Sequence, residues 1–194
     1  MVIAIDGPAG AGKSTVARAV AERLGFTYLD TGAMYRAVGL AGTAACDVAF
    51  DDDGHVLLDG RDVSADIRTA EAGEAASRVA ADPAVREVLV GKQRDLLAHG
   101  DWVAEGRDIA LVVAPDAEIK VFLTADPRER ARRRAADLGA DVDVVLREQA
   151  LRDERDQASG DRTVTEAAPG ATTVDTTGMT LDEVVDRIAG MAGR

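Results

Sequence analysis

The sequence predicts an α/β protein with a five-stranded parallel sheet between layers of helices, because strand-like and helix-like stretches alternate along the chain. Short apolar runs of β-forming residues alternate with longer stretches whose apolar residues recur at helical spacing. Several of the short runs end in an acidic residue, namely Asp6, Asp30 and Glu105. The 194 residues are 46% hydrophobic but only 3% aromatic, which indicates an aliphatic core and a single domain over residues 1–194.

The expected elements follow one another in this alternating order. In the first half we expect strands at residues 2–5 and 26–29 and helices at 15–24 and 31–45. A β-hairpin around an Asp-Gly turn at 48–58 and helices at 69–81 and 83–98 should follow. In the second half we expect strands at residues 102–104 and 119–123, followed by helices at 127–137 and 141–156. A last strand at 172–174 and a terminal helix at 181–188 complete the chain. The cap signals are Gly25, Thr31, Asp126 and Thr180. We expect a small insertion at about residues 46–98 and a helical lid at about 127–156.

Charge and cysteine content exclude several classes of protein. A formal net charge of −12 disfavours binding to nucleic acid, whose phosphate backbone it would repel. The one cysteine, Cys46, cannot form an internal disulfide, which suits a reducing compartment. The N-terminus enters a strand directly and no apolar run is long enough to cross a bilayer. We therefore expect a cytoplasmic monomer that acts on small molecules, with no nucleic-acid or membrane partner.

The first expected strand and helix flank the motif G-x-x-x-x-G-K-[S/T], which residues 7–14 match as GPAGAGKS. Glycines let backbone N–H groups converge on a phosphate, and the following helix adds the positive end of its dipole. Lys13 is expected to reach the outer phosphates and Ser14 to hold Mg²⁺, so the motif predicts a P-loop three-layer α/β/α fold. The alternative is a glycine-rich turn before an ordinary helix. The predicted phosphate-contacting residues are Gly7, Pro8, Ala9, Gly10, Ala11, Gly12, Lys13, Ser14 and Thr15.

Arginines outside this loop predict a second phosphate-bearing ligand. The expected helix after Asp126 carries five arginines, and an arginine-rich pair of helices beside a phosphate loop is typical of a closing lid. A solvated basic helix face is the alternative. Transfer between two phosphorylated molecules needs cations on both sides of the reacting phosphorus, and arginine binds phosphate oxygens in pairs. A GTPase would need a guanine-reading N/T-K-x-D element, which is absent from the sequence.

Longer motifs make the chain resemble the bacterial cytidylate kinases of the nucleoside monophosphate kinase group. The matching stretches are IDGPAGAGKST (5–15), LDTGAMYR (29–36), DGRDVSADIRT (59–69), EAASRVAADPAVR (74–86), VAEGRDIALVVAPDAEIKVFLTA (103–125), RDERD (152–156) and VDTTGMT (174–180). The resemblance implies transfer of the ATP γ-phosphoryl group to CMP, with dCMP as a second acceptor and Mg²⁺ as cofactor. The alternatives are a kinase of UMP, AMP or shikimate type, and a nucleotide-binding regulatory module without turnover.

The resemblance also implies roles for individual residues. Arg36 and Arg107 would bind the CMP phosphate, Arg152 and Asp156 the sugar hydroxyls, and Glu105 would help Ser14 to order Mg²⁺. Arg152 and Asp156 could instead form a surface ion pair, and Glu105 could serve packing or capping. The predicted acceptor-binding residues are Thr31, Tyr35, Arg36, Ser77, Arg86, Arg107, Asp108, Arg152, Asp156 and Arg162. The predicted catalytic residues are Lys13, Arg107, Arg128, Arg132 and Arg152.

Two stretches depart from the family pattern. Residues 45–56 are shorter than expected, because the family carries an additional helix in this insertion. After Asp156 the chain reads QASGDRTVTEA, where the family shows an arginine and a short apolar-proline segment; Arg162 is our candidate for that arginine.

Overall fold

A computed structural model describes residues 1–51, 54–158 and 166–193 of the chain. The chain separates into two compact units, one made of Met1–Leu29 with Gly100–Arg194 and the other of Asp30–His99. The predicted insertion at 46–98 falls inside the second unit. This unit already begins at Asp30, because the helix Thr31–Ala41 packs against the helix Ala70–Ala80. No helix in the described part of the chain combines the length and apolarity needed to cross a membrane.

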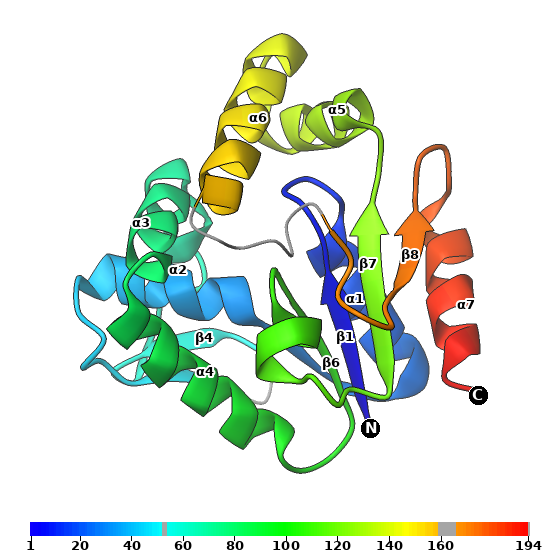
Figure 1. Ribbon diagram of the computed structural model, residues 1–194. Helices are drawn as coiled ribbons and strands as arrows, with labels where there is room; N and C mark the ends of the chain where they lie inside the picture. Colours follow the sequence, from blue (N-terminus) through cyan, green and yellow to red (C-terminus); the bar gives the residue numbers. More distant parts are fainter. Residues whose placement is uncertain (52–53, 159–165, 194) are drawn as a thin grey trace. The chain divides into compact units, whose positions relative to one another are not determined.

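The first unit contains the predicted five-stranded parallel sheet, with strand order β2-β6-β1-β7-β8 (Figure 1). The strands are β1 (Val2–Asp6), β2 (Thr27–Asp30), β6 (Trp102–Gly106), β7 (Ile119–Thr124) and β8 (Thr172–Asp175). The central strand β1 pairs in parallel with β6 and β7, and β8 pairs in parallel with β7. Their carboxyl ends therefore share one edge of the sheet, where ligands bind in folds of this class.

Helices α1 (Lys13–Leu24) and α7 (Leu181–Met191) pack against each other and against the sheet. Ile3 and Ile5 of β1 have no exposed surface and share one apolar core with Val20 of α1 and Ile188 of α7. Burial of consecutive β1 residues is expected for a central parallel strand, which is covered on both faces. A short π-helical turn, η2 (Ile109–Val113), contacts β1 and β6 and was not predicted from sequence.

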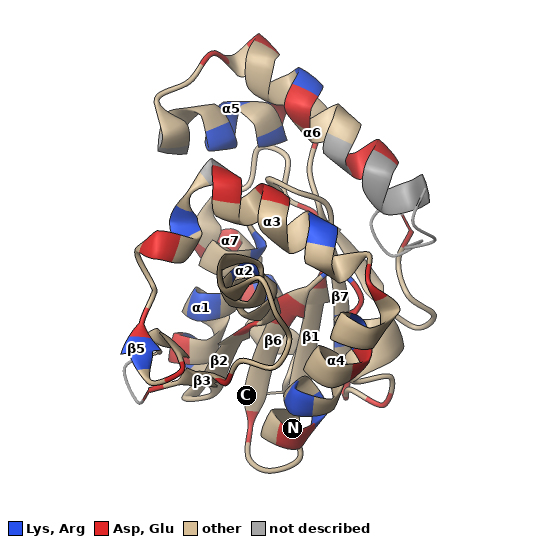
Figure 2. Ribbon diagram, turned by 90° about the vertical axis from the view of Figure 1, so that its left-hand side faces the viewer, with Lys and Arg blue, Asp and Glu red and all other residues tan. Residues whose placement is uncertain are grey.

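The predicted lid is a hairpin of two helices, α5 (Pro127–Leu138) and α6 (Val142–Ala158), joined by a short turn. Asp126 caps α5 by accepting from two backbone N–H groups, and Pro127 occupies the first turn, as predicted. Ala131, Ala135 and Val145 form a small apolar core between the helices. Figure 2 shows basic residues along α5 and both acidic and basic residues along α6.

The second unit combines helices with a small antiparallel sheet. Its elements are α2 (Thr31–Ala41), β3 (Val48–Phe50), β4 (Val56–Leu58), β5 (Arg61–Asp62), η1 (Asp66–Arg68), α3 (Ala70–Ala80) and α4 (Pro83–Leu97). The hairpin β3-β4 was predicted, whereas β5 and the 3₁₀ turn η1 were not. The expected helix 31–45 ends earlier, at Ala41, because Gly42 closes it in a left-handed cap. A side chain at Gly39 would lie 2.9 Å from Ala75, so α2 and α3 approach closely at this point.

The capping box of α7 gives a first testable expectation. The Thr180 side chain accepts from the Glu183 N–H while the Glu183 carboxylate accepts from the Thr180 N–H. Replacing Thr180 with alanine removes this acceptor and should lower the free energy of unfolding by about 1 kcal/mol. Urea unfolding followed by circular dichroism measures the loss, and an unchanged midpoint would contradict the role given to the box.

Candidate active site

The phosphate loop connects β1 to α1 and is shaped by two close approaches of the backbone. Gly7 lies against the backbone of β7, where any side chain would collide with the carbonyl oxygen of Leu123. Gly10 has φ +75°, and a side chain there would collide with the amide of Gln149 from α6. The backbone contact excludes a side chain at Gly7, and the positive φ disfavours one at Gly10, where the loop lies against the α5–α6 hairpin.

The first turn of α1 carries the two residues predicted to handle the triphosphate. Lys13 donates from Nζ to the carbonyl oxygen of Pro8 at 3.0 Å, which places its ammonium over the loop. Ser14 donates from Oγ to Oε1 of Glu105 at 2.6 Å. Tyr28 of β2 donates its hydroxyl to the same oxygen at 3.3 Å, a contact that the sequence did not indicate. The structure thus brings together Lys13, Ser14 and Glu105 at the carboxyl edge of the sheet.

Asp6, at the end of β1, binds the first turn of η2. Its two carboxylate oxygens accept from Ile109 N at 2.9 Å and Ala110 N at 2.8 Å, and the residue is 2% exposed. Burial raises the pKa of Asp6 to about 6, against the two backbone hydrogen bonds, which lower it. The negative charge of Asp108 raises this pKa further, while Lys13 lowers it.

This raised pKa predicts how stability depends on pH. Because the native pKa of about 6 exceeds the ordinary 3.8, the native protein binds the proton more tightly than the unfolded chain. The contribution of Asp6 is therefore most favourable below about pH 4 and is lost as pH rises through 6, by about 3 kcal/mol in all. The difference in unfolding free energy between wild type and Asp6→Asn, measured by urea titration from pH 4 to 8, should fall over this window. A difference that is constant with pH would contradict the raised pKa.

Arg107 and Asp108 follow β6 directly, as predicted from the EGRD motif. Asp108 is 8% exposed and precedes η2, whereas Arg107 is half-buried. They lie one strand away from the phosphate loop, because β6 is the parallel neighbour of β1 with Asp6 in register with Gly106. The sheet therefore places the EGRD turn next to the start of the loop.

Arg130 of α5, which the sequence did not single out, contacts the phosphate loop. Its guanidinium donates to the carbonyl oxygen of Ala9 at 2.7 Å and to Oδ2 of Asp153 at 3.0 Å. Gln149 donates to the backbone oxygen of Arg130 at 3.5 Å. Among the described residues, Arg130 Nε, Gln149 Oε1 and Asp153 Oδ1 are buried without a hydrogen-bond partner. This cluster therefore keeps unused hydrogen-bonding capacity beside the loop.

The two arginines of α5 predicted as catalytic are exposed, and each pairs with a carboxylate on α5 or α6. Arg128 pairs with Asp143 at 3.0 Å, and Arg132 pairs with Glu129 at 3.6 Å. The Arg128 and Arg132 side chains are 62% and 67% exposed. Arg133 instead donates to Oγ1 and to the backbone oxygen of Thr176, both at 2.9 Å, and so anchors α5 to the loop after β8. Catalytic roles for Arg128 and Arg132 stay predictions.

Five predicted acceptor residues lie in the second unit. Arg36 on α2 donates to Oδ2 of Asp30 at 2.8 Å, and Asp30 also caps α2 through Ala33 N. Thr31 was expected to cap α2 but is its first residue and is 4% exposed, because the Asp30 carboxylate takes the capping position. Ser77 on α3 donates to the carbonyl oxygen of Gly73. The elements that carry the five are three helices that pack on one another, with Thr31, Tyr35 and Arg36 on α2, Ser77 on α3 and Arg86 on α4.

The remaining predicted residues lie outside the described part of the structure. These are Arg162 and the side chains of Arg152 and Asp156. Their roles stay predictions.

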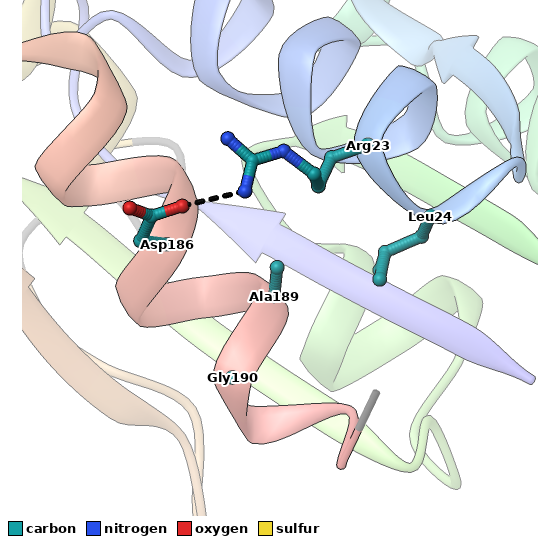
Figure 3. A pocket seen from close by; sticks show the side chains of 5 residues that line it. All are labelled: Arg23, Leu24, Asp186, Ala189 and Gly190. Carbon is teal, nitrogen blue, oxygen red and sulfur yellow. Dashed lines mark hydrogen bonds and ion pairs between the residues drawn. The ribbon is translucent and has the colours of Figure 1, made fainter.

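A surface hollow lies elsewhere, between the C-terminal part of α1 and α7 (Figure 3). It is lined by Arg23, Leu24, Asp186, Ala189 and Gly190, and the exposed Arg23 and Asp186 form an ion pair of 2.7 Å across it. Because Lys13 and Ser14 begin α1 and Arg23 and Leu24 end it, this hollow is at the opposite end of the helix from the phosphate loop. None of its residues belongs to the predicted site.

Solved structures with the same fold include two small-molecule kinases. A shikimate kinase from Bacteroides thetaiotaomicron aligns over 100% of this chain and 99% of its own, with a TM-score of 0.55 and 15% identity. A gluconokinase from Sinorhizobium meliloti aligns over 99% of this chain and 91% of its own, with a TM-score of 0.55 and 18% identity. At these identities the likeness concerns the fold alone.

Relatives of known sequence are much more similar. The chain is 44% identical to a cytidylate kinase of Carboxydothermus hydrogenoformans, covering 100% of this chain and 98% of the relative. It is 46% identical to a cytidylate kinase of Desulforamulus reducens, covering 96% and 94%. The sequence profile described as Cytidylate kinase matches residues 3–53 and 41–194, and these two segments overlap at residues 41–53, close to the stretch predicted to be shortened. The chain therefore belongs to the cytidylate kinase family.

Proposed function

We propose that the protein transfers the γ-phosphoryl group of ATP to CMP, giving ADP and CDP, and that dCMP is a second acceptor. The assignment of ATP as the phosphoryl donor rests on one observation. The phosphate loop, Lys13 and the Ser14–Glu105 pair lie together at one edge of the sheet. Full-length similarity to relatives named cytidylate kinases supports CMP as the acceptor. We further propose that it acts as a cytoplasmic monomer without nucleic-acid or membrane partners.

The reaction needs no covalent intermediate with the enzyme. A CMP phosphate oxygen attacks the γ-phosphorus while the bond to the β,γ-bridging oxygen breaks, and ADP leaves with that electron pair. Since the second pKa of a phosphate monoester is about 6, the attacking oxygen is already anionic at neutral pH and requires no general base. The task of the protein is to hold two anions together and to neutralise the charge between them.

The residues present divide this task between donor and acceptor. Backbone N–H groups of residues 7–15, apart from Pro8, which has none, and the Lys13 ammonium would bind the triphosphate, because the start of α1 favours anions. Arg107 from the β6 edge and Arg36 from α2 would bind the CMP phosphate. Thr31, Tyr35, Ser77, Arg86 and Asp108 would shape the acceptor pocket, and Arg152 and Asp156 would bind the sugar hydroxyls. Arg162 would be a further arginine of the acceptor site. Closure of the α5–α6 lid would exclude water, which otherwise competes as acceptor.

We also propose Mg²⁺ as the cofactor, held through Ser14 and Glu105. The donor set fits: a hydroxyl and a carboxylate 2.6 Å apart are the hard oxygen ligands that Mg²⁺ prefers beside substrate phosphates. Within the described residues, no group of three or more His, Cys, Asp or Glu gathers as a metal cage. That agrees with a metal held mainly by nucleotide and water. When bound, Mg²⁺ would neutralise charge on the β- and γ-phosphates.

Glu105→Gln should weaken the metal site without removing a hydrogen-bonding group. We expect the Mn²⁺ dissociation constant of the enzyme–nucleotide complex, read by electron paramagnetic resonance, to rise about tenfold. Glu118→Gln is the matched control, because its carboxylate binds Val2 N at the opposite end of β1. Equal metal affinity in both variants would contradict the assignment of Glu105.

Phosphorus NMR of a mixture of ATP, CMP and Mg²⁺ tests the proposed reaction directly. We expect the signals of CDP and ADP to grow in equal amounts after the enzyme is added. Release of inorganic phosphate at the same rate with and without CMP would contradict the proposal and favour a nucleotide-binding module.

A further inference from the structure

We propose that Asp6 is a positioning residue of the acceptor site, which holds the Arg107–Asp108 turn in place by capping η2 from the neighbouring strand. The inference rests on the proposed function, because that function assigns Arg107 and Asp108 to the acceptor. Asp6 itself was not among the residues predicted to form the site.

The contacts are those of a helix cap supplied from a distant part of the chain. The first backbone N–H groups of a helical turn have no partner within it, and an aspartate just before the turn is a preferred cap. Asp108 occupies that position in η2, yet its side chain makes no capping hydrogen bond. The Asp6 carboxylate accepts from Ile109 and Ala110 instead, at 2.9 and 2.8 Å. The local aspartate is thus relieved of the capping task.

The arrangement has both a cost and a benefit for stability. Asp6 is 2% exposed, and burial makes its charged form unfavourable. An apolar residue at this position would avoid that cost but would leave the N–H groups of Ile109 and Ala110 without this acceptor. The carboxylate also restrains the backbone. Its two oxygens accept from two adjacent N–H groups and so hold Arg107 and Asp108, the residues just before them, in one position.

The position of Asp6 in the chain connects this contact with the predicted site. Asp6 immediately precedes Gly7, whose backbone is held against Leu123 of β7. Ile109 immediately follows Asp108. One carboxylate therefore links the start of the donor loop to the turn that carries Arg107 and Asp108. Both its oxygens are engaged by backbone N–H groups, so a role as a general base is disfavoured.

The test compares Asp6→Asn and Asp6→Ala with Thr180→Ala, which removes the cap of α7 and touches no predicted site residue. Steady-state kinetics give kcat and the KM values for CMP and ATP, calorimetry gives CMP affinity, and hydrogen exchange reports the amides of Ile109 and Ala110. We expect Asp6→Ala to raise the KM for CMP about tenfold or more, with that for ATP changed less than about threefold. Asp6→Asn keeps one acceptor oxygen and should show an intermediate effect. Both variants should exchange faster at residues 109–110, and Thr180→Ala should not.

The outcomes separate this inference from the proposed function. If the wild-type protein fails to bind CMP, the proposed function is wrong. If it binds CMP and the Asp6 variants lose only stability, as Thr180→Ala does, Asp6 is a structural cap and the inference is overturned. Equal increases in both KM values would also overturn it, because the effect would then not be specific to the acceptor. Should Asp6→Ala fail to fold, the same comparisons are made with Asp6→Asn.

Discussion

Replacing Lys13 with alanine should lower kcat by about 10²-fold or more, the usual consequence of removing a preorganised charge from a phosphoryl-transfer site. The lysine begins α1, and its ammonium is held over the phosphate loop by the carbonyl of Pro8. No other lysine lies in the loop or in the first turn of the helix. The measurement is the initial rate of ADP formation at saturating ATP and CMP.

Lys120→Ala is the matched control for this experiment. Lys120 also donates from Nζ to the carbonyl of a proline five residues earlier, Pro115, but it lies on β7 outside the predicted site. We expect its turnover to stay within about twofold of wild type, since surface changes remote from the chemistry rarely matter. Near-full activity of Lys13→Ala, or an equal loss in both variants, would remove the support for the phosphate loop as the donor site.

Replacing Arg130 with alanine should lower the free energy of unfolding by about 3 kcal/mol, because a mostly buried carboxylate would lose its cation. The side chains of Arg130 and Asp153 are 10% and 17% exposed, and their ion pair spans α5 and α6 at 3.0 Å. The substitution also removes the hydrogen bond to Ala9 of the phosphate loop. Urea unfolding, monitored by circular dichroism, measures the change.

Arg128→Ala provides the control, because it also bridges α5 and α6 at 3.0 Å, to Asp143. This pair is exposed, at 62% and 63%, and pairs of this kind contribute at most about 1 kcal/mol. Equal losses of unfolding free energy for Arg128→Ala and Arg130→Ala would contradict the view that burial makes the Arg130–Asp153 pair contribute more to stability than the exposed pair. The double variant Arg130→Met with Asp153→Leu removes both charges and should recover much of the loss.

Features written in local sequence were predicted well. Asp126 and Pro127 start α5, and Thr180 with Glu183 starts α7, because caps depend on residues a few positions apart. The alternation of strands and helices likewise predicted the parallel sheet. The phosphate loop was predicted because its glycines meet steric demands that only glycine satisfies, as at Gly7.

Features that depend on distant contacts could not be predicted. Five arginines on one helix look alike in sequence, and only packing decides that Arg130 reaches Ala9 while the side chains of Arg128 and Arg132 stay exposed. The link between Asp6 and η2 joins residues more than one hundred positions apart and has no local signature. Tyr28 likewise meets Glu105 only because β2 and β6 are neighbours in the sheet. These contacts required the three-dimensional structure.

The identity of the acceptor is the central claim, and a substrate panel tests it most directly. ADP formation from ATP and Mg²⁺ is measured with CMP, dCMP, UMP, AMP and shikimate at equal concentrations, and kcat/KM is compared. We expect CMP and dCMP to exceed every other acceptor by about tenfold or more, as expected when buried polar groups read the base. No preference for CMP or dCMP over the other acceptors would contradict the account.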